Sequence, residues 1–366
     1  MKMEVEASHY DKVVWSPEPC VPGTMFYKPE KIAKCSIGGR SEIILQCPCR
    51  IDVGLIDYSA LKFTDGHNDY KAGEMSFAAN AYTKVKAGLI RGEDLIKSER
   101  PLIVKHVLEM IRKVTDYNDG FSIETVAHPY RHVGFGSSAI LSESTATAVN
   151  MLLGEPLSFR ELRKLIAYNF VEEADSTEDL VFPGASTGGS FNTAKYGGFV
   201  ITSSECEMIF RVAIPGDVRF VVGTPRVHVA GPEESETDVN CMSWERHNER
   251  VNAAKSALWI VTEVMPFAVQ GDWKRVGDVF YNYTLFGGKA MQMLYYQAAL
   301  ADTLFQMKAD HIEGGWMTSA GPSLVAFTRT TDGTMKKARD IFEERSFDSV
   351  VVKPNNRGMC EIPSLL

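Results

Sequence analysis

The sequence predicts an α+β protein with two domains, in which helices cover one face of a sheet. Three observations support this prediction. The chain has 366 residues, which is enough for two domains of ordinary size. Strand-like segments are gathered in two regions, 42–126 and 198–223. The carboxyl-terminal part then ends with a strand, a helix and a strand over 324–353, which is the pattern of a βαβ unit.

The first 40 residues predict an irregular arm, because prolines from Pro17 to Pro29 and the pair Gly38 and Gly39 interrupt regular structure. In the helix that follows the first strands, apolar residues recur at spacings of three and four. The elements expected after the arm are strands at 42–45, 50–57 and 75–85, a helix at 102–111 and a strand at 121–126.

Two further helices are expected before the middle of the chain. The first is long and reaches Leu153, where Gly154 and Pro156 stop it. Ser158 and Glu161 then form a capping box, the usual start signal of a helix. An acidic loop follows this second helix.

The domain boundary is expected between residues 203 and 204. This divides the chain into an arm at 1–40, an amino-terminal domain at 41–203 and a carboxyl-terminal domain at 204–366. The elements expected around and after the boundary are strands at 198–203, 207–214 and 218–223, helices near 247–265, 271–286 and 289–307, a strand at 324–329, a helix at 336–345 and a strand at 349–353.

Charge and composition exclude several classes of protein. A net charge of −8 argues against an extended nucleic-acid surface and favours a small-molecule substrate. Seven cysteines, an odd number, favour reduced thiols and a cytoplasmic location. The chain has no unbroken apolar stretch of the length that crosses a membrane, since the most apolar one, 257–269, is interrupted by Thr262, Glu263 and Pro266. We therefore expect no membrane and no nucleic-acid partner.

The most informative segment is Gly134-Phe135-Gly136-Ser137-Ser138-Ala139, between a predicted strand and the long helix. Glycines let successive backbone N–H groups face one ligand, and the start of the helix adds unpaired donors with a partial positive charge. A phosphate or diphosphate suits such a turn, and the serine hydroxyls suit hydrated Mg²⁺. A capped helix after a tight loop is the alternative interpretation.

Two other polar segments are candidates for the same cleft. Thr187, Gly188, Gly189, Ser190 and Asn192 form a small loop that suits a 5-phosphate or a ring carboxylate, although turn chemistry alone would also explain them. In the second domain, Thr318, Ser319 and Gly321 follow a glycine-rich stretch and are expected to line the cleft from the other side.

The ordered motifs resemble the GHMP kinase superfamily. Residues 129–139 are similar to its second signature, whose glycine-serine loop binds nucleotide phosphates, and residues 314–324 are similar to its third. Within the superfamily the closer resemblance is to β-ribofuranosylaminobenzene 5′-phosphate synthase and related C-nucleoside synthases. The four stretches that carry it are 49–57, 195–200, 214–222 and 319–322. The resemblance implies a GHMP-type two-domain fold, with a ribosomal protein S5-like amino-terminal domain and a ferredoxin-like α/β sandwich as the carboxyl-terminal domain.

One residue departs from the kinase pattern. Kinases of the superfamily carry a catalytic aspartate seven residues ahead of the central glycine pair, and Ser190 stands at that position. A serine hydroxyl is a poor proton acceptor at neutral pH unless another base assists it. Asp175 and Asp179 are possible substitutes, so an ATP-dependent small-molecule kinase stays open as the alternative, as does a ligand-binding relative without activity.

The synthase family joins a carboxylated aromatic ring to 5-phosphoribosyl 1-diphosphate with loss of diphosphate and CO₂. The resemblance therefore implies an enzyme with these two substrates, Mg²⁺ as cofactor and a homodimeric assembly. It further implies Ser138 and Glu172 as metal ligands, although a solvated acidic residue is the alternative for Glu172. The remaining candidates are Arg50, Arg131, Gly134–Ala139, Thr187–Gly189, Thr318, Ser319 and Gly321 for substrate phosphates, Asp57, Ser190 and Asn192 for catalysis, and His67 and Trp316 for the acceptor ring.

Overall fold

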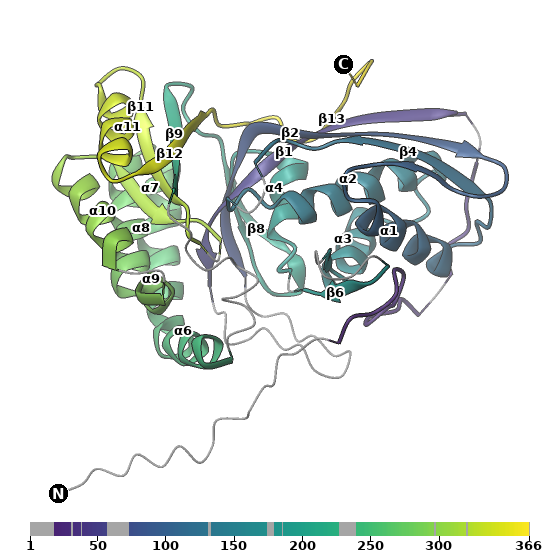
Figure 1. The fold of residues 1–366 in the computed structure, drawn as a ribbon, viewed down its shortest axis with the longest axis horizontal. Helices are drawn as coiled ribbons and strands as arrows, with labels where there is room; N and C mark the ends of the chain where they lie inside the picture. The colour runs from purple at the N-terminus through teal and green to yellow at the C-terminus, as the bar shows by residue number, and fades with distance from the viewer. Residues whose placement is uncertain are drawn as a thin grey trace, which may run out of the picture.

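The computed structural model describes two lobes, each built on its own sheet (Figure 1). The residues that it describes are 18–30, 32–37, 39–56, 73–130, 133–173, 179–184, 186–226, 239–295, 298–319 and 321–365.

The sheet of the first lobe is built around two long strands, β1 (Glu42–Leu55) and β2 (Glu74–Ile90). Its order is β13-β1-β2-β4-β3, and β7 pairs with both β2 and β8. All pairs are antiparallel except that of β3 with β4. The shorter strands are β3 (Leu95–Lys97), β4 (Gly120–Val126), β7 (Phe199–Thr202), β8 (Met208–Val212) and β13 (Cys360–Glu361).

Helices cover one face of this sheet. The helices α2 (Ser137–Leu152) and α4 (Gly189–Tyr196) pack on β1 and β2, and α1 (Pro101–Val114) packs on α2. Because α2 lies between the sheet and α1, nearly all of its residues are buried, the polar ones included. The capping box at Ser158 is confirmed: both of its hydrogen bonds are present at the start of α3 (Phe159–Tyr168).

The second lobe has a four-stranded sheet in the order β10-β11-β9-β12. Since β11 (Leu324–Arg329) and β12 (Phe347–Val352) are both antiparallel to β9 (Val218–Pro225), they are parallel to each other, and α11 (Thr334–Glu344) connects them. This is the expected βαβ ending, with β9 inserted between its two strands. The remaining elements are β10 (Gly314–Met317), α6 (Val239–Trp259), a π-helical turn (Ile260–Val264), α7 (Met265–Gln270), α8 (Trp273–Phe286), α9 (Ala290–Tyr295) and α10 (Ala298–Ala309).

The chain crosses between the sheets twice. It leaves the first sheet after Val212 and enters the second at Val218, beyond the boundary that the sequence suggested at residues 203 and 204. The reason is that β8 pairs with β7 and completes the first sheet. After β12 the chain returns, and β13 pairs with β1.

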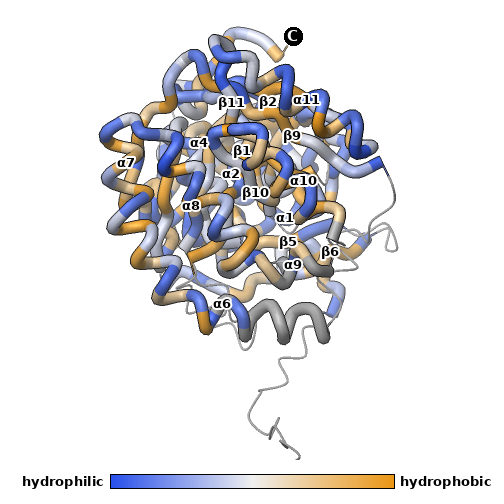
Figure 2. The backbone as a smooth tube through the Cα atoms, turned by 90° about the vertical axis from the view of Figure 1, so that its left-hand side faces the viewer, coloured by the Kyte–Doolittle hydropathy of each residue, from blue (hydrophilic) through white to orange (hydrophobic). Residues whose placement is uncertain are grey.

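A shared apolar core holds the two lobes together. Phe77 on β2 contacts the rings of Phe199 in its own lobe and of Phe220 and Trp316 in the other, at centroid distances of 4.6, 5.0 and 5.6 Å. Along α8, hydrophobic and hydrophilic residues alternate in Figure 2, and its apolar side faces this core. The junction between the sheets is therefore a packed interior. Among the described residues, none of the helices has the length and apolar character that crossing a bilayer requires.

The described part of the arm, from residue 18 on, is tied to the first lobe. Gly23 N donates to Nδ1 of the buried His106 on α1 at 2.9 Å, and Phe26 N donates to the side-chain oxygen of Asn169 at 2.7 Å. Cys20 forms a β-bridge with Val181 in β6 (Val181–Pro183). Residues 1–17 lie outside the described part of the chain.

We predict that His106 makes the native state sensitive to acid. Burial lowers its pKa to about 4, and its Nδ1 accepts the Gly23 N–H while Nε2 bonds Asn169 O at 2.8 Å, so the ring must stay neutral. An unfolded histidine titrates near pH 6.5. The free energy of unfolding therefore falls between about pH 6.5 and 4, with about 2 kcal/mol lost by pH 5 through this residue.

Urea denaturation at pH 7 and pH 5 measures this loss. The His106→Gln variant should show a smaller decrease in stability between the two pH values than the wild type, whereas a change at the exposed His311 should leave the decrease unaltered. An equal decrease in His106→Gln and wild type would contradict the assignment.

Candidate functional site

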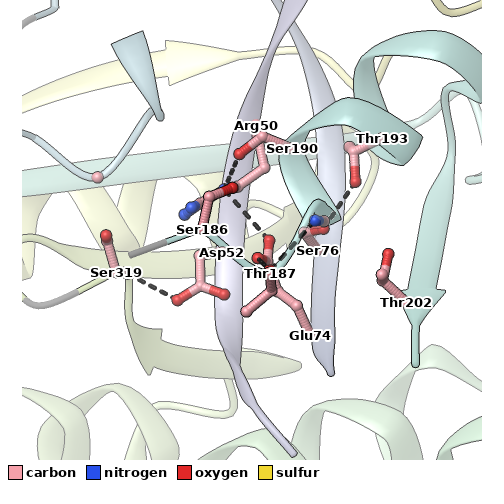
Figure 3. A network of polar contacts seen from close by, with 12 residues as sticks. Arg50, Asp52, Glu74, Ser76, Ser186, Thr187, Ser190, Thr193, Thr202 and Ser319 are labelled. Carbon is pink, nitrogen blue, oxygen red and sulfur yellow. Dashed lines mark hydrogen bonds and ion pairs between the residues drawn. The ribbon is translucent and has the colours of Figure 1, made fainter. Parts of the chain in front are cut away.

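The central strand β1 presents two opposite charges on one face. Arg50 and Asp52 are two residues apart, so their side chains point the same way. Asp52 is buried, and the Arg50 side chain keeps 14% of its surface exposed. Figure 3 shows both of them with Glu74 of β2 and the loop that leads into α4. Burying charges is costly unless each is paired, so the surrounding contacts define the site.

Arg50 is held from two sides. Its Nε donates to Ser190 Oγ at 3.0 Å and lies 3.2 Å from Glu74 Oε1. The Thr187 hydroxyl donates to the other Glu74 oxygen. Burial alone would lower the pKa of Arg50, but the carboxylates of Glu74 and Asp52 raise it above its usual value, so the guanidinium keeps its charge.

A third carboxyl group, Glu143 of α2, lies in the same interior. Burial raises its pKa well above the usual value, against the opposing influence of Arg50. Burial likewise raises the pKa of Glu74, again opposed by Arg50. The Oε2 atom of Glu143 has no hydrogen-bond partner among the described residues.

Asp52 is paired with Lys289, which precedes α9 in the second lobe. Lys289 Nζ donates to Asp52 Oδ2 at 3.0 Å and to the backbone oxygens of Met317 and Ser319 at 2.7 and 2.9 Å. Ser319 N donates to the same Asp52 oxygen at 3.0 Å. With three acceptors, the ammonium is fully engaged, so Lys289 fixes both Asp52 and the loop after β10.

The predicted phosphate loop lies at this junction. Gly134 has φ +82°, and a Cβ there would lie 2.3 Å from Thr318 Cγ2, so only glycine fits. The Thr318 hydroxyl donates to Gly134 O at 3.1 Å. Gly136, with φ +67°, precedes the first turn of α2 beside Arg50. The loop thus joins the start of a helix to both lobes, as the sequence suggested.

Two predicted residues of this loop have buried apolar side chains, so only their backbone groups can contact a ligand. The Phe135 ring is buried in the core, and the backbone oxygen of Phe135 accepts a hydrogen bond from the backbone N–H of Arg50 at 3.2 Å. Ala139 is also buried, in the first turn of α2. Ser137 is partly exposed, and its neighbour Ser138 is buried.

The second predicted loop also contacts Arg50, through Ser190 Oγ. Gly188 has φ +73°, and a Cβ on Gly189 would lie 2.4 Å from Glu74 Oε2, so the loop runs close to this carboxylate. The structure brings Arg50, the two glycine loops and Thr318 together. Gly321, with φ +91°, ends the same turn as Thr318, to whose oxygen its N–H donates at 3.1 Å.

Two predicted residues turn out to be structural. Asn192 is fully buried: its amide donates to Thr202 Oγ1 and Cys206 O, and its oxygen accepts from Arg163. Since all of these partners are protein groups, Asn192 positions α4 instead of facing a ligand. Trp316 is also fully buried, stacks on Phe77 and donates to Asp52 O at 2.8 Å. It belongs to the core between the lobes and not to an acceptor pocket.

The two predicted metal ligands are adjacent. Ser138 Oγ donates to Glu172 Oε2 at 2.5 Å, and Glu172 stands in the short strand β5 (Val171–Glu173) with 38% of its side chain exposed. Arg100 donates to both of them, at 2.8 Å to Glu172, and its Nε reaches Glu173. Glu173 in turn accepts the N–H groups of Leu102 and Ile103 at the start of α1.

These residues fit a magnesium ion that arrives with a phosphate. The hydroxyl and the carboxylate are the oxygen ligands that Mg²⁺ prefers, but the Arg100 guanidinium already neutralises them. Among the described residues, no group of three or more histidines, cysteines, aspartates or glutamates is placed to hold a metal ion alone. Phosphate oxygens would therefore have to complete the coordination.

Several predicted residues cannot be compared with the structure. Asp57, His67 and Arg131 lie outside the described residues, as does Asp175, one of the two substitutes considered for the missing kinase aspartate. The other, Asp179, is exposed beside β6.

The buried ionisable residues around the site were not among the residues predicted from the sequence. Asp52 stands two residues after Arg50 in a strand pattern, which is a usable signal that both share one face. Lys289, Glu74, Glu143 and Arg100 belong to segments without a motif, and only the folded chain brings them together.

Comparison with known proteins agrees with this architecture. Residues 102–182, which lie in the first lobe, are similar to the family described as the GHMP kinases N terminal domain. Comparison with curated protein sequences found no match.

Solved structures with the same fold cover both lobes. Homoserine kinase from Cytophaga hutchinsonii is 16% identical, with a TM-score of 0.60 over 89% of this chain and 98% of that one. Mevalonate diphosphate decarboxylase from Staphylococcus aureus is 15% identical, with a TM-score of 0.63 over 88% and 98%. A third, MDDEF in complex with MVAPP, AMPPCP and magnesium, is 15% identical, with a TM-score of 0.59 over 88% and 99%. The chain therefore has the two-domain fold of the GHMP superfamily.

We predict that Lys289→Met destabilises the protein by about 3–5 kcal/mol, because Asp52 is then left buried without its cation. Urea denaturation measures the loss. In the double variant with Asp52→Asn, part of the stability should return. Lys308→Met, which removes the half-exposed partner of Asp278, is the control and should cost less than about 1 kcal/mol. An unchanged free energy of unfolding in Lys289→Met would contradict this prediction.

We also predict that Arg100 weakens cation binding at Ser138 and Glu172. Titration with Mn²⁺, followed by electron paramagnetic resonance, should give a higher affinity for Arg100→Met than for the wild type, because the competing charge is gone. Adding Glu172→Gln to that variant should abolish the gain. If Arg100→Met and the wild type bound Mn²⁺ equally, these oxygens would not be metal ligands.

Proposed function

We propose that the protein is an enzyme that joins a carboxylated aromatic or heteroaromatic ring to C1 of 5-phosphoribosyl 1-diphosphate, with loss of diphosphate and CO₂. The fold it shares with GHMP enzymes supports catalysis in general. The finer proposal draws on the ordered motifs of the C-nucleoside synthase family and on the chemistry of the residues around Arg50.

One observation carries the choice between a synthase and a kinase. Ser190, at the position of the kinase aspartate, is buried and accepts a hydrogen bond from the Arg50 guanidinium. A hydroxyl that already accepts from a cation is an even weaker base than serine normally is. The site is thus better suited to a reaction that requires no proton abstraction at Ser190.

The proposed reaction meets this condition. The ring carbon that bears the carboxylate attacks C1 of the ribose, the C1–O bond breaks, and its electron pair leaves on diphosphate. The bond to the carboxylate then breaks, CO₂ leaves, and its electrons restore the aromatic ring. No proton has to be removed from the ring carbon.

The chain's own groups suit the charge that develops. Negative charge grows on the departing diphosphate, and donors fixed in advance stabilise such charge best. The N–H groups at the start of α2, beside Gly136 and Arg50, are such donors. Bound magnesium would neutralise diphosphate oxygens, with Ser138 and Glu172 as its protein ligands.

An ATP-dependent small-molecule kinase is the second candidate. It is favoured by Asp52, whose Oδ1 is buried without a hydrogen-bond partner in the described part of the chain and is a carboxylate oxygen of the kind that accepts a proton from a substrate hydroxyl. In this alternative, Asp52 and not Ser190 is the base.

We predict that the enzyme, given 5-phosphoribosyl 1-diphosphate, Mg²⁺ and a panel of hydroxybenzoates, aminobenzoates and pyrazole carboxylates, releases diphosphate and CO₂ in equal amounts without ATP. Ser190→Ala should keep activity within about tenfold, since loss of a general base usually costs 10²–10⁴-fold. Arg50→Met should lose more than about 100-fold, with its fold checked by circular dichroism.

If no acceptor in the panel led to release of diphosphate, the result would count against the synthase. The kinase would replace the synthase as the proposed function if the wild type consumed ATP and phosphorylated a small molecule, and if Asp52→Asn did not.

A further inference from the structure

Two polar atoms of β1 are buried without a hydrogen-bond partner among the described residues. They are Nη1 of Arg50 and Oδ1 of Asp52. Buried polar atoms in folded proteins are nearly always hydrogen-bonded, and leaving one without a partner is unfavourable. Both atoms belong to charged groups that are held at another atom, Arg50 through Nε and Asp52 through Oδ2.

The orientation of Asp52 is fixed by its neighbours. Its Oδ2 accepts from Lys289 Nζ and from Ser319 N, each at 3.0 Å. Lys289 is itself held by the oxygens of Met317 and Ser319. Rotation of the carboxylate would break both bonds, so Oδ1 stays directed away from Lys289 and Ser319.

The two atoms belong to one side of the site. In Figure 3 the end of the Arg50 guanidinium and the Asp52 carboxylate both lie on the side of β1 where Ser186 and Ser319 stand. Residues two apart on a strand are separated by about 7 Å along it. The two side chains are therefore neighbours on this face of β1, and one small ligand can contact both of them.

The two atoms require opposite partners. A guanidinium N–H only donates, so Arg50 Nη1 requires an acceptor and favours an anionic oxygen. An ionised carboxylate only accepts, so Asp52 Oδ1 requires a donor such as a hydroxyl and repels phosphate. A ligand that satisfies both has a phosphate at one end and a hydroxyl further along, as a pentose phosphate does.

We propose that Arg50 and Asp52 form a sugar-phosphate subsite, in which Arg50 Nη1 binds an oxygen of the 5-phosphate and Asp52 Oδ1 accepts a hydrogen bond from the 2-hydroxyl of the ribose. The choice of a pentose phosphate rests on the proposed function. The pairing of hydroxyl with Asp52 rests on the two unpartnered atoms. The subsite assigns to Asp52 the contact with ribose that the sequence analysis sought in Asp57.

The test is the binding of ribose 5-phosphate and of 2-deoxyribose 5-phosphate to the wild-type protein, measured by calorimetry without a second substrate. Ribose 5-phosphate should bind about tenfold more tightly or better, because the deoxy sugar leaves the charged acceptor unpaired. This comparison does not depend on whether any variant folds.

Asp52→Asn then tests the residue. Its side-chain oxygen can still accept from Lys289 and Ser319, which directs the amide nitrogen, a donor, to the place of Oδ1. The preference for the ribose compound should shrink to about threefold or less. Asp348→Asn, at a side chain that is 76% exposed in the second lobe, is the charge-matched control and should keep the full preference.

Equal binding of the two sugar phosphates to the wild type, binding of neither at millimolar concentration, or an unchanged preference in Asp52→Asn would each overturn the subsite. The synthase is tested separately by diphosphate release. An Asp52-dependent preference for ribose 5-phosphate without diphosphate release would support the subsite and rule out the synthase. Diphosphate release without this preference would support the synthase and rule out the subsite.

Discussion

The site depends on the burial of two opposite charges on the central strand of the first sheet. Arg50 and Asp52 cannot stay in a packed interior unless other groups compensate them. Ser190 and Glu74 compensate the cation from the first lobe, and Lys289 with Ser319 N compensates the anion from the second. Because the compensating groups come from both lobes, the same contacts that permit the charges also close the lobes around them.

The glycines serve this arrangement. Gly134 lets the loop before α2 approach Thr318 of the second lobe, and Gly189 lets the start of α4 approach Glu74. Side chains at either position would displace a helix start from Arg50. The outcome is a junction where backbone donors, a guanidinium and a carboxylate face one another, with the aromatic core around Phe77 holding both sheets in place. Such a site suits a small anionic ligand that carries hydroxyl groups.

Much of this could be predicted from local pattern. The helix that begins after Gly136, the capping box at Ser158 and the closing βαβ unit follow from spacing and turn chemistry, and all three are present. The roles of Trp316 and Asn192 could not be predicted, because a glycine-rich or polar neighbourhood does not reveal which side of a strand or helix faces the core. The contribution of Lys289 could not be predicted either, since no motif marks a residue whose partner is 237 positions away.

The central claim is that backbone N–H groups at the start of α2 bind a departing diphosphate beside Arg50, whose guanidinium holds the sugar phosphate. A crystal structure with phosphoribosyl diphosphate and an acceptor that cannot react tests it most directly. The account predicts diphosphate oxygens within hydrogen-bond distance of the N–H groups of 136–138, with the 5-phosphate at Arg50. A diphosphate bound elsewhere in the molecule, with these donors facing only solvent or protein, would contradict it.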